Sequence, residues 1–225
     1  MSAESCELPE MVPVFPLSEV VLFPNQYLQL HIFEPRYRTM TSEAMESHKL
    51  IAMALLKPGF EEHYYTNHAP IEPVVGVGRI MAAENLDGGK FNILLRGVAR
   101  ARIVAEAPGR PYRCARLKAL PTPCLSQARA TELRGTLQDT VQRCSNLDCD
   151  LYRQWQQLFD SSLAVADLVD LIAGTLPAPA DVRQTLLAEA NPTERAALLV
   201  DHLTTICDVA EQRSRLHRRG DWTVN

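Results

Sequence analysis

The stretch Val12–Tyr37, VPVFPLSEVVLFPNQYLQLHIFEPRY, decides how the N-terminal half of this chain folds. Within it, Leu28, Leu30 and Ile32 alternate with polar residues, which predicts a β-strand with one buried face. The three prolines that precede this strand cannot donate to a sheet ladder, so they predict strand ends, edges or turns. Pro35, which follows the strand, favours the first position of a helix. The chain is therefore predicted to turn from strand into helix at this proline, and its neighbours Glu34 and Arg36 are expected to fix the corner.

The residues that follow continue this mixed pattern. Apolar residues at helical spacing predict a helix over Arg36–His48, and the apolar run Ile51–Leu56 predicts a buried strand. A polar, proline-rich segment, Phe60–Pro73, is predicted to be a loop. Gly76 and Gly78 predict a bulge or a close backbone approach. Short strands separated by turns are predicted at Val74–Ala83, Phe91–Leu95, Arg100–Glu106 and Tyr112–Leu120, which is typical of an antiparallel barrel or a strongly bent sheet.

The composition changes after Pro121 and Pro123, where helical periodicity replaces the strand pattern. Asn191-Pro192-Thr193-Glu194 has the residue types of a helix start, and the helix it opens is predicted to end near Arg213. The expected organisation is a disordered tail over residues 1–10, a β-rich subdomain over 11–122, a helical subdomain over 123–212 and a basic tail over 213–225.

Bulk properties exclude several classes of protein. A net charge of -4 over 225 residues argues against a chain that binds polyanions with its whole surface. No apolar run approaches the roughly 18 residues that span a bilayer, and the acidic N-terminus does not look like a signal peptide. The sequence therefore predicts a cytoplasmic protein. In that compartment its six cysteines are expected to be free thiols. The sequence contains no CxxC pair, so the cysteines do not indicate a zinc site.

The residues needed for catalysis are not arranged in any recognisable pattern. The glycines lack the spacing of a phosphate-binding loop, and no GxSxG motif marks a nucleophilic serine. Metal ligands could come from Glu61, Glu62, His63 and His68, but residues of this kind in a polar loop are more typical of a solvated surface. The sequence thus predicts no catalytic residue, no metal and no cofactor, and a chain that is not an enzyme.

Two groups of residues are candidates for binding a partner. Phe60, Tyr64 and Tyr65 cluster in the polar loop, where they could anchor a partner or fold back over the barrel core. The second group could form a basic patch for RNA, or could pair with the acidic residues of the helical half. Its members are Arg96, Arg100, Arg102, Arg113, Arg116 and Lys118. No aromatic platform is interleaved with these cations, which favours the structural alternative.

The order of several segments resembles a known family. After the opening stretch come GVGRI at Gly76–Ile80, FNILLRGVARARI ending at Ile103, and a long helical segment at Val165–Leu203 that contains QTLLAEANPTERAALL. In this order they are similar to the N-terminal substrate-recognition domain of Lon proteases in its stand-alone form. The resemblance covers about residues 8–208, which is nearly the whole chain.

The resemblance implies an α+β fold, in which a PUA-like β pseudo-barrel with one inserted helix precedes a C-terminal α-helical bundle. It also implies binding of unfolded or extended protein segments, and self-association into a homo-oligomer. The ATPase and Ser–Lys protease modules of Lon have no counterpart in this sequence. Our hypothesis is a non-catalytic protein-binding or peptide-binding module that serves as an adaptor for proteolysis or as a chaperone. The alternative is an RNA-binding PUA-like protein, and a third, weaker option is a small-molecule enzyme.

Overall fold

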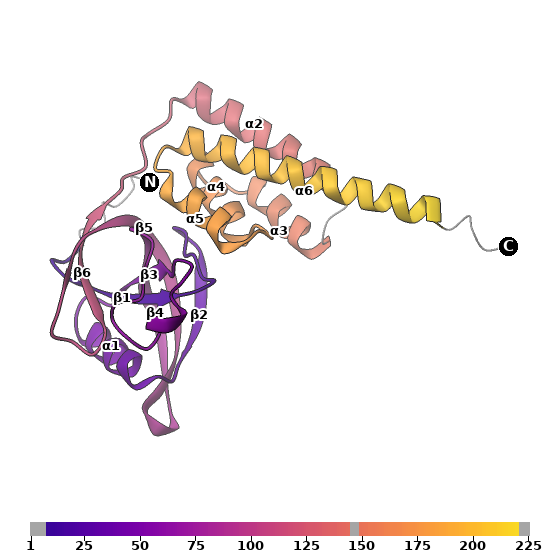
Figure 1. Ribbon diagram of the computed structural model, residues 1–225. Helices are drawn as coiled ribbons and strands as arrows, with labels where there is room; N and C mark the ends of the chain where they lie inside the picture. Colours follow the sequence, from indigo (N-terminus) through magenta and orange to yellow (C-terminus); the bar gives the residue numbers. More distant parts are fainter. Residues whose placement is uncertain (1–7, 145–148, 221–225) are drawn as a thin grey trace. The chain divides into compact units, whose positions relative to one another are not determined.

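The computed structural model describes residues 8–144 and 149–220, which form two compact units. The described part of the first unit comprises residues 8–121 and 176–190, and that of the second comprises 122–144, 149–175 and 191–220. Figure 1 traces the strands of the first unit in indigo to magenta and the later helices in rose to yellow. The combination of a mixed sheet with helices confirms the predicted α+β class.

The sheet of the first unit closes on itself. Its order is β2-β5-β4-β3-β1-β6, and β6 also pairs with β5, so five strands form a ring and β2 remains outside it as an edge. The strands β1 and β3 run parallel, whereas the other pairs are antiparallel. The strands are β1 (Val12–Leu17), β2 (Tyr27–Ile32), β3 (Leu50–Leu55), β4 (Val74–Leu86), β5 (Lys90–Ala107) and β6 (Arg113–Ala119).

Two glycines bring the segment before β2 close to the sheet. A Cβ atom at Gly76 would lie 1.9 Å from the backbone oxygen of Leu22, and one at Gly97 would lie 1.9 Å from that of Phe23. The close approach predicted for Gly76 is thus confirmed, and a bulge follows it between Val77 and Gly78. The prediction that the chain breaks into two strands at Gly97 was wrong. The strand continues through Gly97 because this glycine makes room for a neighbouring backbone.

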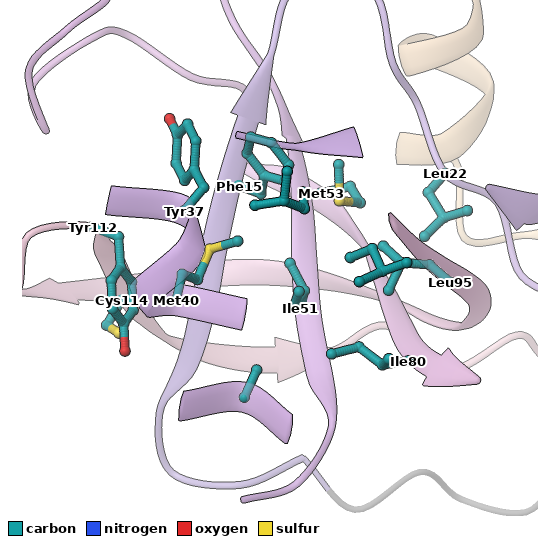
Figure 2. Packing of buried hydrophobic residues seen from close by; sticks show 13 residues of the cluster. Phe15, Leu22, Tyr37, Met40, Ile51, Met53, Ile80, Leu95, Tyr112 and Cys114 are labelled. Carbon is teal, nitrogen blue, oxygen red and sulfur yellow. The ribbon is translucent and has the colours of Figure 1, made fainter. Parts of the chain in front are cut away.

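The inserted helix α1 (Pro35–Glu46) begins at the predicted proline and packs its Tyr37 and Met40 side chains into the core. Figure 2 shows these two residues against Phe15 and Ile51 of the sheet. The rings of Phe15 and Tyr37 are 4.2 Å apart between centroids. Burial of such large side chains contributes about 1.5–3 kcal/mol each, so the corner between β2 and α1 is tied to the barrel core.

The first unit contains a second helix, which the sequence did not predict for the β-rich subdomain. Residues 176–190 were predicted to lie in the helical subdomain, but α5 (Ala180–Ala188) belongs to the β-rich unit and contacts β4. Gln184, Leu186 and Leu187 are its buried residues, and the Gln184 side chain bonds to the Val74 carbonyl of β4. Periodicity identified the helix correctly, but it carries no information about which unit a helix joins.

The second unit consists of α2 (Gln127–Arg143), α3 (Cys149–Phe159), α4 (Val165–Thr175) and α6 (Pro192–Gly220). The predicted start of α6 is confirmed, since Asn191 Oδ1 accepts a hydrogen bond from the Thr193 backbone N–H at 3.0 Å. The helix continues to Gly220, so its predicted end near Arg213 was too early. Residues 221–225 of the predicted basic tail lie outside the described residues.

Two buried links hold the second unit together. Arg195 Nε lies 2.8 Å from Asp170 Oδ1, and both side chains are almost completely buried. Cys144 and Cys207 form a disulfide with their Cα atoms 5.3 Å apart, which corrects the expectation that all cysteines are free thiols. The two cysteines are 63 residues apart in the chain and meet only because α2 packs against α6. Spacing along the sequence could not show this.

The predicted N-terminal tail is partly ordered. Residues 1–7 lie outside the described residues, but Leu8 is half-buried and packs against the cluster that contains Val12 and Val14. Within the described part of the chain, no helix is both long and apolar enough to cross a membrane.

Candidate functional site

A groove of about 960 Å³ lies within the first unit, between α5 and the rim of the barrel. We call it the α5 groove. Its wall combines the end of β3 and the start of β4 with the segments that follow β1 and β3. The apolar part of the wall includes Leu55, Leu56, Pro58, Phe60, Pro73 and Val74. A concave surface of this size, with apolar walls and a few polar groups, is typical of a ligand-binding site.

Three side-chain bonds to backbone carbonyls hold α5 against the barrel. Gln184 Nε2 donates to the Val74 carbonyl at 2.8 Å, Arg100 Nε donates to the Leu187 carbonyl at 3.2 Å, and Arg183 donates to the Glu19 carbonyl at 2.9 Å. The bonds from Gln184 and Arg100 are buried. The bond from the charged Arg100 is worth about 1.5–3 kcal/mol and the one from the neutral Gln184 amide about 0.5–1.5 kcal/mol. Together they fix the wall that α5 supplies to the groove.

The predicted aromatic residues lie together beside this groove. They belong to the segment from Lys57 to Pro73, which we call the aromatic loop, and Phe60 itself lines the groove. The Tyr64 ring lies 5.9 Å from the Phe60 ring and 5.1 Å from the Tyr65 ring, the second pair in edge-to-face geometry. Phe60 and Tyr64 are half-buried, whereas 84% of Tyr65 is exposed. An aromatic side chain held this far into solvent is suited to contact a partner.

Side chains from the barrel side fix the backbone of the aromatic loop. Arg36 pairs with Glu34 at 3.1 Å, as expected for the strand-to-helix corner, but its guanidinium also donates to the carbonyls of Tyr64 and Thr66. Arg113 donates to the Ala69 carbonyl at 2.5 Å. Arg36 was predicted to act only at the corner, and this second role was missed because no spacing in the sequence signals it.

The predicted basic patch is only partly exposed. Arg100 is 1% exposed and Arg113 is 7% exposed, so neither belongs to a surface patch, which corrects the prediction for these two residues. Arg113 pairs with Glu106 at 2.6 Å. The other four members are all exposed. Three of them, Arg102, Arg116 and Lys118, occupy neighbouring register positions on β5 and β6, whereas Arg96 lies six residues from Arg102 along β5.

The free thiol of Cys114 is buried in the barrel core and is not suited to nucleophilic chemistry. Burial raises the pKa of the Cys114 thiol, and Arg110 opposes this shift only in part. A thiol with a raised pKa is a poor nucleophile at neutral pH. Among the described residues, no three His, Cys, Asp or Glu side chains are grouped to hold a metal ion. The loop residues considered as ligands in the sequence, Glu61, Glu62, His63 and His68, are all exposed.

Comparison with known proteins places this architecture in a family. Residues 11–205 match the model of the ATP-dependent protease La (LON) substrate-binding domain. The chain belongs to this family. The match covers the substrate-binding domain, and no ATPase or protease domain accompanies it in the matched region.

The curated relatives that match this chain are named as Lon proteases. The chain is 27% identical over 198 residues to Lon protease of Citrifermentans bemidjiense, covering 88% of the chain and 24% of the relative. It is 26% identical over 211 residues to Lon protease 2 of Bdellovibrio bacteriovorus, covering 93% of the chain and 26% of the relative. The chain thus spans about a quarter of the length of these relatives.

Solved structures support the same fold. The Lon N-terminal domain protein of Xanthomonas campestris superposes with a TM-score of 0.60 at 19% identity, covering 85% of this chain and 97% of that one. The N-terminal domain of the Mycobacterium avium complex Lon protease superposes with a TM-score of 0.64 at 16% identity, covering 86% and 98%. At these identities the likeness concerns the fold alone.

Proposed function

We propose that this Lon substrate-binding-domain protein recognises extended, mainly apolar segments of other proteins in the α5 groove. Phe60 in the groove wall and the exposed Tyr65 are the proposed anchors, as the sequence suggested. The observation that carries this proposal is the position of the aromatic loop at the groove, in a chain whose family is defined by substrate binding. Aromatic side chains dominate the binding energy of many protein interfaces.

The charges around the groove suggest which segments it accepts. Four carboxylate side chains line it, from Glu19, Glu61, Glu72 and Asp181, against two cations, Arg102 and Arg183. The lining therefore carries a charge of -2, counted as two cations minus four carboxylates. Apolar segments flanked by Lys or Arg should bind more tightly than segments flanked by Asp or Glu.

The same charges weigh against the RNA-binding alternative at this site. An acidic lining repels phosphate, and two of the six arginine and lysine residues proposed for RNA contact are buried. Arg102 lines the groove together with acidic residues. We therefore do not propose RNA binding at the α5 groove.

The proposed role is non-catalytic and is expected to be carried out in the cytoplasm. The protein would act either as an adaptor that delivers bound segments to a protease, or as a chaperone that holds them. The two roles differ in outcome, because an adaptor shortens the lifetime of its client in the presence of a protease, whereas a chaperone lengthens it. Addition of the protein to a degradation assay with a purified Lon protease and an unfolded client distinguishes them.

A titration tests the binding itself. Fluorescence anisotropy of a labelled, reduced and carboxymethylated model protein should rise with added wild-type protein. Phe60→Ala should weaken binding by about tenfold, the loss expected for one aromatic anchor. Tyr27→Ala removes a ring that is also exposed but lies on β2, away from the groove lining, and it should leave the affinity unchanged. No rise in anisotropy with the wild-type protein would contradict the proposed function.

A further inference from the structure

Two arginines oppose each other on an exposed face of the sheet. Arg79 of β4 lies directly opposite Arg96 of β5, and Tyr27 of β2 lies opposite Arg96 on its other side. Residues that are directly opposite in an antiparallel pair point to the same face, with Cα atoms about 4.5–5.5 Å apart. All three side chains are exposed, and we call them the arginine row. Like charges in this arrangement destabilise a sheet, so an anion bound from outside the chain would relieve the repulsion.

Both guanidinium groups are held in place without being neutralised. Arg96 Nη2 donates to Asn25 Oδ1 at 3.0 Å, and Arg79 Nη1 donates to the His48 carbonyl at 3.4 Å. Neither arginine forms an ion pair with a carboxylate in the part of the chain that the structure describes. Neutral acceptors thus orient the two side chains and leave their charge available to a ligand.

The backbone beside both acceptors is strained. Among the described residues, only Asn25 and Lys49 combine a side chain with a positive φ, 63° and 56° respectively. The Asn25 N–H donates to the Gly97 carbonyl at 2.8 Å, and the Lys49 carbonyl, which follows His48, accepts from the Ile80 N–H at 2.8 Å. Strained positions of this kind are concentrated at functional sites. Their occurrence next to each arginine is a second observation that points to a binding site.

The surroundings of the row supply an apolar contact and no competing acid. Tyr27 is 58% exposed, and Leu94, two residues before Arg96 and therefore on the same face, is half-buried. The carboxylate of Glu84 on this face accepts a bond from Asn92 Nδ2 at 3.0 Å. Asn92 lies four residues from Arg96 along β5, which corresponds to about 13 Å. Glu84 is thus held away from the two guanidinium groups.

We propose that the arginine row binds an acidic segment of a partner protein, with two neighbouring carboxylates on Arg79 and Arg96 and an apolar side chain on Tyr27. Guanidinium groups match the planar geometry of carboxylates, and an aromatic ring adds apolar contact. Nucleic acid fits less well, because the chain carries a net charge of -4 and two arginines do not form a track along a phosphate backbone. This proposal does not rest on the α5 groove, whose acidic lining favours segments of the opposite charge.

Peptides of opposite charge test the ligand class. The probe is a labelled peptide of repeated Glu-Glu-Leu units, and its counterpart has Gln in place of each Glu. Anisotropy titrations with the full chain should show that the acidic peptide binds at least about tenfold more tightly, and added salt should reduce this difference. Phe60→Ala should leave the affinity for the acidic peptide unchanged, because Phe60 belongs to the α5 groove.

Matched charge substitutions test the site. Arg79→Gln/Arg96→Gln should weaken binding of the acidic peptide by about tenfold or more. Its melting temperature should equal or exceed that of the wild type, because the repulsion between the arginines is gone. Arg116→Gln/Lys118→Gln removes the same charge from exposed positions of β6 and should change the affinity by less than about twofold.

Single substitutions separate the parts of the row. Tyr27→Ala should weaken acidic-peptide binding by about threefold or more. Asn25→Gly should do so as well, because it removes the amide that orients Arg96 while glycine accepts the φ of 63°.

Three results would overturn the proposal. The first is equal affinity for the acidic peptide and its Gln counterpart. The second is an equal loss in the two double variants, which would indicate a general effect of net charge. The third is a single-stranded oligonucleotide that binds more tightly than the acidic peptide and depends on the same two arginines, which would make the row a site for nucleic acid.

Discussion

Strand β3 and the aromatic loop that follows it are neighbours in the chain but have opposite surroundings. All six residues of β3 are buried, and β1 and β4 pair with it on its two sides. Of the seventeen loop residues between Lys57 and Pro73, only Ala69 is buried. The loop is nevertheless tied to the barrel by Arg36 and Arg113.

The difference shows two ways of fixing a backbone. The backbone of β3 is fixed by its ladder hydrogen bonds and by the packing of its side chains on both faces of the sheet. This arrangement leaves no surface for a partner. In the loop a few charged donors hold the backbone carbonyls, so side chains such as Tyr65 remain free to make contacts in solvent. Substitutions in the barrel should therefore affect folding first, and substitutions in the loop should affect binding first.

The largest expected effect comes from Gly76, which pairs with Met53 of β3. In Gly76→Ala the new Cβ would collide with the Leu22 backbone, so the free energy of unfolding should fall by about 3 kcal/mol or more. Urea denaturation followed by circular dichroism measures the change. Gly135→Ala is the control, because a Cβ there meets nothing within 4 Å and should stabilise α2 by up to about 1 kcal/mol. Equal stability of the two variants would refute the close approach.

The next effect comes from Arg113, which connects the two regions. Arg113→Met removes the bond to the buried Ala69 carbonyl and the pair with Glu106, so a loss of about 2 kcal/mol is expected. Hydrogen exchange of the amides near Ala69 should also become faster. Arg116→Met, on the same strand but exposed, should change stability by less than about 0.5 kcal/mol. A larger loss for Arg116→Met than for Arg113→Met would reverse our assignment of the buried cation.

A smaller effect appears at alkaline pH through Tyr37. Burial raises the pKa of this phenol from 10.0 to about 12, with Arg36 opposing the shift. The unfolded state therefore loses the proton first. The stability is complete below pH 10 and falls as the pH rises through 12; about 1.4 kcal/mol is lost by pH 11. Stability measured over this alkaline range should fall less steeply for Tyr37→Phe. An equally steep fall in both proteins would contradict the assignment.

The effect of Arg36→Ala on stability should be smaller still, about 1 kcal/mol, because the bonds it loses are partly exposed. Its effect on client affinity should exceed that of Arg96→Ala, which removes an exposed bond to Asn25 far from the aromatic loop in sequence. Denaturation and anisotropy on the same preparations separate the two effects. If Arg36→Ala destabilised the protein strongly without weakening client binding, Arg36 would act only at the corner.

The smallest effect on stability is expected at Tyr65. Tyr65→Ala removes a ring that is 84% exposed, so the free energy of unfolding should change by less than about 0.5 kcal/mol. Client affinity should fall about fivefold or more, measured by the same anisotropy titration. Unchanged affinity would remove Tyr65 from the proposed anchors.

Local patterns predicted much of the fold. The alternation at Leu28–Ile32, the proline that starts α1 and the cap at Asn191 act over a few residues, and the structure contains all three elements. The apolar run that became β3 was predicted for the same reason, since its residues are apolar on both faces.

Long-range contacts were beyond the reach of the sequence. Arg100 looks like part of a basic patch until α5 brings the Leu187 carbonyl to it from 87 positions away. The same holds for Arg36 and the aromatic loop, and for the disulfide between Cys144 and Cys207. The aromatic cluster of the candidate site could be predicted, because its residues are close in sequence. The groove beside it could not, because α5 joins the first unit from a distant part of the chain.

Site-specific photo-cross-linking tests the central claim most directly. A benzophenone amino acid in place of Tyr65, or in place of Tyr27 as the control, is irradiated with an unfolded, carboxymethylated client. We predict strong cross-links from position 65, few from position 27, and loss of the former when excess unlabelled client is added. Equal cross-linking at the two positions, or none at position 65 while the client still binds, would contradict recognition at the aromatic loop and the α5 groove.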